Sequence, residues 1–374
     1  MYRNVVITGI GLMTPLGKTP AEVLERIEAG QSAVTQPPFD ASNLLCKLHS
    51  PITEFHAEQY IEDAKALRLM NRDARLAVAA ARLAIADAKL QAGRDYPAES
   101  ISLYGSTGLT GMPAEEAANI VKHSADSNGN MDLGRFGRIT LKRVRPVLSF
   151  KILANMPICF VSIFANIRGQ NAVYTPWEGQ GAQAIVMGIR AIQEGRTTCA
   201  LAGGCDVSTH EFAFVTLQQL GAFQSWSKHG IGPVPGEGAA FLVLEDEESA
   251  AARGVRVYAR VSAHALGTIG TSTDAEETFS ELISRTGPQR VNSIVLASDG
   301  DVQIAEAEAQ ALARQALKSN FQIRPKRHLG NLYAAAAAVQ VGLAALIAHR
   351  DKQQTLANCF GYGSQQGVFL LEGI

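Results

Sequence analysis

The stretch from Asn171 to Gly195, NAVYTPWEGQGAQAIVMGIRAIQEG, restricts the fold of this chain more than any other. Residues 172–175 are typical of a short buried strand, and apolar residues at helical spacing follow until the final glycine. Gly179 and Gly181 bracket a tight turn between the two elements. Such a strand–turn–helix elbow presents one side chain at the mouth of a site. Here we expect that residue to be Glu178, because a carboxylate is favoured at a helix N-terminus.

The composition indicates a folded protein with a large core. Of the 374 residues, 47% are hydrophobic and 18% are charged, which excludes a disordered chain. The net charge of −1 argues against a nucleic-acid binder or a protein that binds anionic membranes. The five cysteines are scattered without a CxxC pair, which argues against a metal site or disulfides and predicts a cytoplasmic protein with reduced thiols.

Neither end of the sequence predicts a signal peptide or a membrane span. Residues 5–9 have the length of a strand and then turn, unlike a secretory signal. Residues 332–348 are apolar but short for a span, alanine-rich, and interrupted by Gln340, so we expect a buried helix.

Buried strands alternate with helical patterns throughout, which predicts a layered α/β fold. A helix is expected over residues 19–29, with Thr19 as its N-cap and Pro20 at its first position. One long helical pattern covers residues 64–92. The second half begins near Arg256 and again alternates strands and helices.

Several of these motifs resemble the β-ketoacyl synthases, the condensing enzymes of fatty acid and polyketide synthesis. In that family the elbow carries a cysteine, followed three residues later by glycine, so Glu178 stands at the cysteine position. The opening residues 4–17, the Gly-rich turn 106–111, the pair Asn155-Met156 and the segment 236–244 also resemble the family. The resemblance covers nearly the whole chain and is weakest over residues 119–151.

The resemblance implies a thiolase-like α/β fold with two duplicated halves, residues 1–255 and 256–374. Each half would contribute a five-stranded sheet around shared central helices, giving a layered α-β-α-β-α architecture. Composition and periodicity alone do not reveal this duplication.

The resemblance also implies that the catalytic residues are lost. In the family a cysteine thiolate takes the acyl chain, and two histidines stabilise developing negative charge. The first histidine position, after a strand and before glycine, is Asp299, and the second, before the alanine-rich helix, is Asn331. The family's lysine is retained as Lys326. His328 lies three residues from the second position, and we expect it to be a loop histidine bonded to the backbone.

Three further sets of residues correspond to binding surfaces in the family. Leu109 and Met112 map beside the acyl pocket, and Tyr362 corresponds to a gating aromatic in a Gly-flanked loop. For these three residues, ordinary core packing is the alternative. A basic run would meet an acidic acyl carrier protein, or would simply form solvated surface; it consists of Arg135, Arg138, Lys142, Arg143 and Arg145.

These departures resemble a chain-length factor, a silent ketosynthase-like subunit that pairs with an active ketosynthase and shapes the acyl tunnel in type II polyketide systems. Acyl chains would arrive on phosphopantetheinylated acyl carrier protein, without another cofactor. Chain-length factors often have glutamine at the cysteine position, so Glu178 leaves other branches open, such as polyene pigments.

Two alternatives remain open at this stage. One is an active condensing or decarboxylating loading subunit that uses Glu178, although an ionised Asp299 has the wrong polarity for an oxyanion. The other is a scaffold that only recruits carrier protein. Glu178 itself is either a structural carboxylate at a helix N-terminus or a fixed anion that fills the space of an acyl-cysteine.

Overall fold

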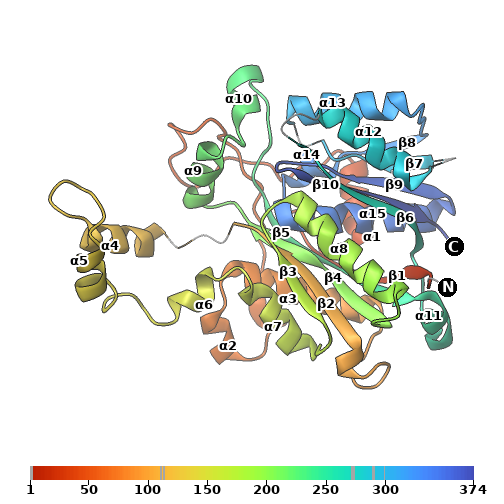
Figure 1. The fold of residues 1–374 in the computed structure, drawn as a ribbon, viewed down its shortest axis with the longest axis horizontal. Coiled ribbons are helices and arrows are strands. Elements are labelled where there is room, and N and C mark those ends of the chain that lie inside the picture. Colours follow the sequence, from red (N-terminus) through yellow and green to blue (C-terminus); the bar gives the residue numbers. More distant parts are fainter. Residues whose placement is uncertain (1–2, 110–111, 113, 271–273, 289–290, 299) are drawn as a thin grey trace.

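The computed structural model describes residues 3–109, 112, 114–270, 274–288, 291–298 and 300–374 (Figure 1). Ten strands in these residues form one mixed sheet in the order β3-β2-β4-β5-β1-β6-β10-β9-β7-β8. Their bounds are β1 Val5–Met13, β2 Ile101–Thr107, β3 Asn171–Tyr174, β4 Cys199–Val207, β5 Glu237–Asp246, β6 Ala259–Thr268, β7 Val291–Val295, β8 Phe321–Ile323, β9 Gln354–Cys359 and β10 Gln365–Glu372.

The two halves of the chain repeat one pattern of strand pairing. In the first half, β2 is parallel to β3 and β4, and β5 is antiparallel to β4 and β1. In the second half, β7 is parallel to β8 and β9, and β10 is antiparallel to β9 and β6. A short antiparallel pairing of β1 with β6 joins the two sets of five strands into one sheet.

Helices lie between and outside the two sets of strands (Figure 1). The central helices α8 (Glu178–Gln193) and α15 (Ala336–Asp351) pack against each other and against strands of both halves. Helices α3 (Arg72–Asp87) and α7 (Met156–Ala165) cover the outer face of the first half, and α12 (Ala275–Thr286) covers that of the second, with α13 (Val302–Arg314) packed against it. The predicted α-β-α-β-α layering is therefore confirmed.

The remaining helices are α1 Pro20–Glu28, α2 Ala64–Leu69, α4 Ala114–Ser124, α5 Leu133–Arg135, α6 Leu148–Ile152, α9 Glu211–Gln219, α10 Gln224–His229, α11 Glu247–Arg253 and α14 Pro325–Leu329. As predicted, α1 begins with Thr19 as N-cap, whose side chain accepts a hydrogen bond from the Glu22 N–H. The segment with α4 and α5 extends away from the body of the molecule as an arm, and the chain returns to the body at α6 (Figure 1).

The single helix predicted over residues 64–92 is wrong. The chain forms α2 and α3 there, separated at Met70 and Asn71. The Asn71 side chain accepts a hydrogen bond from the Ala74 N–H at 2.9 Å and so begins a new helix. The cap interrupts an apolar periodicity that continues on both sides.

The apolar helix near the C-terminus is part of the core. Within the described residues, Tyr333–Asp351 is long and apolar enough to cross a membrane, but 83% of its apolar window is buried inside the protein. This agrees with the buried helix expected from the sequence.

Candidate functional site

The predicted elbow forms, and it places Glu178 in the interior. β3 ends at Tyr174, Trp177 is the N-cap of α8, and Glu178 is the first helical residue with no exposed surface. A Cβ at Gly179 would come within 2.0 Å of the carbonyl oxygen of Gln365. This close approach of α8 to β10 explains the glycine at position 179. The prediction that Gly179 and Gly181 bracket a turn before the helix is wrong, because both glycines lie in the first turn of α8.

Two residues from the second half of the chain bind the Glu178 carboxylate. Its Oε1 accepts hydrogen bonds from Asn331 Nδ2 at 2.7 Å and from Lys326 Nζ at 3.2 Å. The lysine also donates to the carbonyl oxygen of Phe360 at 2.8 Å, and the Asn331 Oδ1 accepts from the Tyr333 N–H. Glu178, Lys326 and Asn331 are 0%, 3% and 1% exposed, so a buried ion pair occupies the site.

The structure thus brings together three of the four positions that the sequence singled out. The fourth, Asp299, lies outside the described residues. In this cluster the Glu178 Oε1 accepts both hydrogen bonds. The Glu178 Oε2 has no hydrogen-bond partner among the described residues.

A loop that follows β9 closes over the carboxylate. A Cβ at Gly361 would lie 2.2 Å from both Cδ and Oε1 of Glu178, so only glycine fits there. The fully buried Gln366 holds this loop: its Oε1 accepts from the Gly361 N–H at 2.9 Å, and its Nε2 donates to the Gly363 carbonyl oxygen at 2.7 Å. The Gly361 backbone therefore lies directly against the Glu178 carboxylate.

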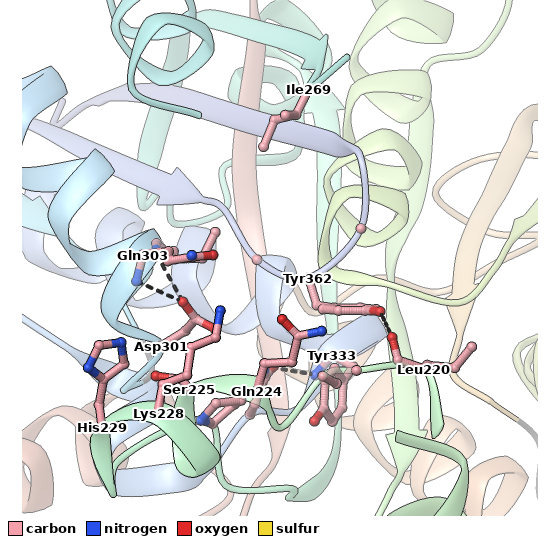
Figure 2. Close-up of a pocket in the computed structure, with 17 residues that line it drawn as sticks. Leu220, Gln224, Ser225, Lys228, His229, Ile269, Asp301, Gln303, Tyr333 and Tyr362 are labelled. Carbon is pink, nitrogen blue, oxygen red and sulfur yellow. Dashed lines mark hydrogen bonds between the residues drawn. The ribbon is translucent and has the colours of Figure 1, made fainter. Parts of the chain in front are cut away.

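A cavity of about 260 Å³ lies on the other side of this loop, and we call it the Tyr362 cavity (Figure 2). Its lining includes Asn331, Tyr333, Gly361 and Tyr362, together with residues of α10 and α13. The Tyr362 hydroxyl donates to the carbonyl oxygen of Leu220, and burial raises the pKa of this tyrosine. Its ring meets the Trp177 ring edge-on at 4.8 Å between centroids, which closes the cavity toward the elbow.

Leu109 and Met112 line two other cavities, which adjoin each other. The Leu109 cavity, of about 350 Å³, extends to Thr175 and Pro176 just before the elbow. The Met112 cavity has a volume of about 510 Å³. Both cavities are lined by His210 and Phe212. Leu109 and Met112 therefore line cavities that share part of their walls, whereas Tyr362 lines a separate cavity.

Sequence reasoning missed two buried carboxyl groups in the first half of the chain, Asp73 on α3 and Asp206 on β4. Burial raises the pKa of Asp73 to about 7, with a further rise from the charge of Glu237. Burial also raises the pKa of Asp206, although a hydrogen bond from Ser208 lowers it in part. For Asp73 the sequence did contain a signal that the residue is buried. This acidic residue stands three positions before the buried Leu76 and so lies on the apolar face of α3.

Comparison with known proteins decides the family. A sequence profile described as the N-terminal domain of β-ketoacyl synthases matches residues 2–250. The chain belongs to the β-ketoacyl synthase family. Its ten-stranded sheet with flanking helices is the thiolase-like ketosynthase fold.

Two curated ketosynthase relatives are 27% and 28% identical to this chain over the aligned residues. The 3-oxoacyl-[acyl-carrier-protein] synthase 2 of Synechocystis is 28% identical over 276 residues, which cover 71% of this chain but only 62% of that enzyme. The tetracenomycin polyketide synthase ketoacyl synthase beta subunit of Streptomyces glaucescens is 27% identical over 368 residues, covering 93% of this chain and 86% of that subunit.

Solved structures of ketosynthases share the whole fold. The ishigamide ketosynthase/chain length factor has a TM-score of 0.80 at 20% identity, with full coverage of both chains. A β-ketoacyl synthase from Burkholderia phymatum has a TM-score of 0.81 at 21% identity, also with full coverage of both. Identities this low establish the fold alone.

The other ketosynthase positions predicted from sequence lie at the surface. His328 is half-buried, and its Nδ1 lies 2.7 Å from the carbonyl oxygen of Gln31. The contact with the backbone agrees with the expectation, but His328 lies in α14 and not in a loop. The five basic residues lie on the arm, with Arg135 half-buried and Arg138, Lys142, Arg143 and Arg145 exposed. Arg145 forms an exposed ion pair with Glu116 at 3.4 Å. Among the described residues, no group of three His, Cys, Asp or Glu is placed to hold a metal ion.

Proposed function

We propose that this chain is a non-catalytic, ketosynthase-like subunit, a chain-length factor. In this role it pairs with an active β-ketoacyl synthase and shapes the acyl tunnel of a type II polyketide or fatty-acid-like system. The observation that carries the proposal is the Glu178 carboxylate, buried at the elbow and bonded to Asn331 and Lys326. A carboxylate held in this way supplies no thiolate to take an acyl chain.

No cysteine replaces the missing nucleophile within the described part of the chain. Cys46, Cys199, Cys205 and Cys359 are fully buried, and burial raises the pKa of each thiol. The thiol form of these four cysteines predominates in such buried surroundings, and the thiol is a poor nucleophile. Cys159 is half-buried on α7, outside the elbow.

The alternative of a loading subunit that uses Glu178 is disfavoured by the same geometry. A general base must reach the proton that it removes. Here the Gly361 backbone lies against the carboxylate, and two donors already bind its Oε1.

Two surface features support pairing with another subunit. Among the described strands, β3 pairs only with β2, so it leaves one edge of the sheet open. Exposed apolar side chains also occur on α7, on the arm and between the two, including Ile163 at 68%, Leu133 and Leu153. Open sheet edges and exposed apolar residues are surfaces that proteins usually cover.

The remaining partners follow from the same role. The catalytic partner is a ketosynthase, and the acyl chains arrive on acyl carrier protein, for which the basic residues of the arm are the candidate contact. The complex is cytoplasmic, with no nucleic acid and no membrane span involved. The alternative is a scaffold that does not contact the acyl chain. Variants of the tunnel residues would distinguish this scaffold from a chain-length factor.

Native mass spectrometry of co-expressed pairs tests this proposal. Co-expression with candidate ketosynthases should yield a 1:1 species. Ile163→Glu places a charge on the exposed apolar surface and should reduce that species, whereas Ile231→Glu, at an exposed apolar residue beyond α10, should leave it unchanged. A stable homodimer that binds none of the ketosynthases offered would contradict the proposal.

A further inference from the structure

His210 lines both the Leu109 cavity and the Met112 cavity, and the start of α9 fixes the orientation of its ring. This residue is the N-cap of α9, and its Nδ1 accepts a hydrogen bond from the Ala213 N–H at 3.2 Å. A ring nitrogen that accepts carries no proton, so the proton of the neutral imidazole is on Nε2. Burial lowers the pKa of His210, although the charges of two neighbouring glutamates raise it in part, and the neutral ring is therefore favoured.

The Nε2–H of this imidazole is a donor that the protein leaves unused. The described residues offer it no hydrogen-bond partner, yet it is not one of their fully buried atoms without a partner, so it keeps accessible surface. Thr175 and Thr216 are the other polar side chains that line the Leu109 cavity, and the Thr216 hydroxyl already donates to the Phe212 carbonyl oxygen at 2.8 Å. The rest of the lining is Gly108, Leu109, Ala154, Pro176, Phe212 and Ala213.

The groups around this imidazole favour a neutral acceptor over an anion. Asp73 and Glu211 also line the Met112 cavity, and the Asp73 Oδ1 is a buried atom without a partner among the described residues. The charge of Arg72 is engaged by the Glu237 carboxylate, to which it donates at 2.7 Å and 2.8 Å. A carboxylate ligand would meet these acidic groups, whereas a carbonyl oxygen needs only the N–H.

We propose that His210 donates a hydrogen bond to a carbonyl oxygen along the acyl chain, so that this site prefers chains with keto groups over fully reduced chains. This inference rests on the proposed function, in which the protein shapes an acyl tunnel. A ketone oxygen only accepts, which matches a ring nitrogen that only donates. A methylene group at the same depth would displace water from the N–H without replacing its hydrogen bond, which is unfavourable.

Binding of matched probes to the purified full chain tests the proposal. The probes are the N-acetylcysteamine thioesters of octanoic acid and of 3-oxo-, 5-oxo- and 7-oxooctanoic acid, compared by isothermal titration calorimetry. The three oxo probes place a carbonyl group at different depths along the same chain. At least one of them should bind the wild type about 2- to 10-fold more tightly than the octanoyl probe.

Two variants of His210 remove the donor in different ways. His210→Ser keeps an oxygen that can cap α9, and His210→Phe keeps the volume of the ring, so one variant decides if the other does not fold. Both should bind the octanoyl probe and show no preference for an oxo probe. Thr216→Val is the control, because it changes the same cavity at a hydroxyl that is already engaged, and it should retain the preference.

The inference is overturned if no probe binds the wild type, if no oxo probe is preferred, if the preference survives in a folded His210 variant, or if Thr216→Val loses it. A ketosynthase pair that forms without this preference refutes the inference alone. The preference without any ketosynthase pair refutes the proposed function alone.

Discussion

Replacing Glu178 by leucine should destabilise the protein, because the carboxylate is half of a buried ion pair. The Glu178 Oε1 and Lys326 Nζ are 3.2 Å apart. At an effective dielectric constant of about 20, Coulomb attraction over this distance is about 5 kcal/mol before the cost of desolvation. Removal of one partner of a buried pair typically costs about 3–5 kcal/mol, and the lower end applies where other groups share the charge of the lysine.

Glu178→Gln separates the effect of charge from that of shape. The amide oxygen can still accept from Asn331 and Lys326, so we expect a loss of only about 1–2 kcal/mol in the free energy of unfolding. Lys326→Met removes the other charge. The double variant Glu178→Leu/Lys326→Met should be more stable than the sum of its single variants predicts, by about 1–3 kcal/mol.

Equilibrium unfolding in guanidinium chloride at pH 7, followed by circular dichroism, measures these differences. The wild type, the two single variants and the double variant must show similar slopes of unfolding free energy against denaturant concentration for the comparison to hold. A Glu178→Leu variant as stable as the wild type, or a coupling energy near zero, would refute the view that this ion pair holds the elbow against the second half of the chain.

Three further predictions address catalysis, pH dependence and chain length. The Glu178→Cys variant, given acyl and malonyl carrier protein without a ketosynthase partner, should form no β-ketoacyl product over multiple turnovers. The reason is that each lost hydrogen-bond donor to the oxyanion typically lowers the rate by about 10²–10³. Sustained product formation, measured by mass spectrometry, would show that the catalytic positions are misassigned. The pKa of the Asp73 carboxyl group is about 7 in the folded protein, against an ordinary value of 3.8, so the folded state binds the carboxyl proton more tightly than the unfolded state. The free energy of unfolding of the wild type should therefore fall as pH rises from about 4 to above 7. Asp73→Asn should therefore gain stability relative to the wild type across that window, by at most about 4 kcal/mol, and a constant difference between the two from pH 4 to pH 8 would contradict the assignment. Enlarging Leu109 or Met112 should shorten the products of the reconstituted pair, since overpacking costs about 1–3 kcal/mol. Changes at Tyr362, which lines a separate cavity, should affect product length less. If variants at Leu109 and Met112 gave products of unchanged length in normal yield, neither residue would line the tunnel.

Local features of the fold were predictable because they depend on neighbouring residues. Apolar periodicity located α8, and cap chemistry located the start of α1 at Thr19 and Pro20. The same reasoning failed between α2 and α3, where alanine-rich periodicity on both sides concealed the cap formed by Asn71. Pattern alone could not decide between a continuous helix and a capped break.

The sequence by itself determined that Glu178 stands at the N-terminus of α8, because strand, turn and helix signals lie within about 25 residues. Only the tertiary structure decided its partners. Lys326 and Asn331 are 148 and 153 residues away, and they reach the carboxylate because the two sets of strands enclose α8 and α15 together. The unpaired oxygen of Asp73 was equally beyond sequence reasoning, since it depends on which groups of distant segments surround α3 and which of them are already engaged elsewhere.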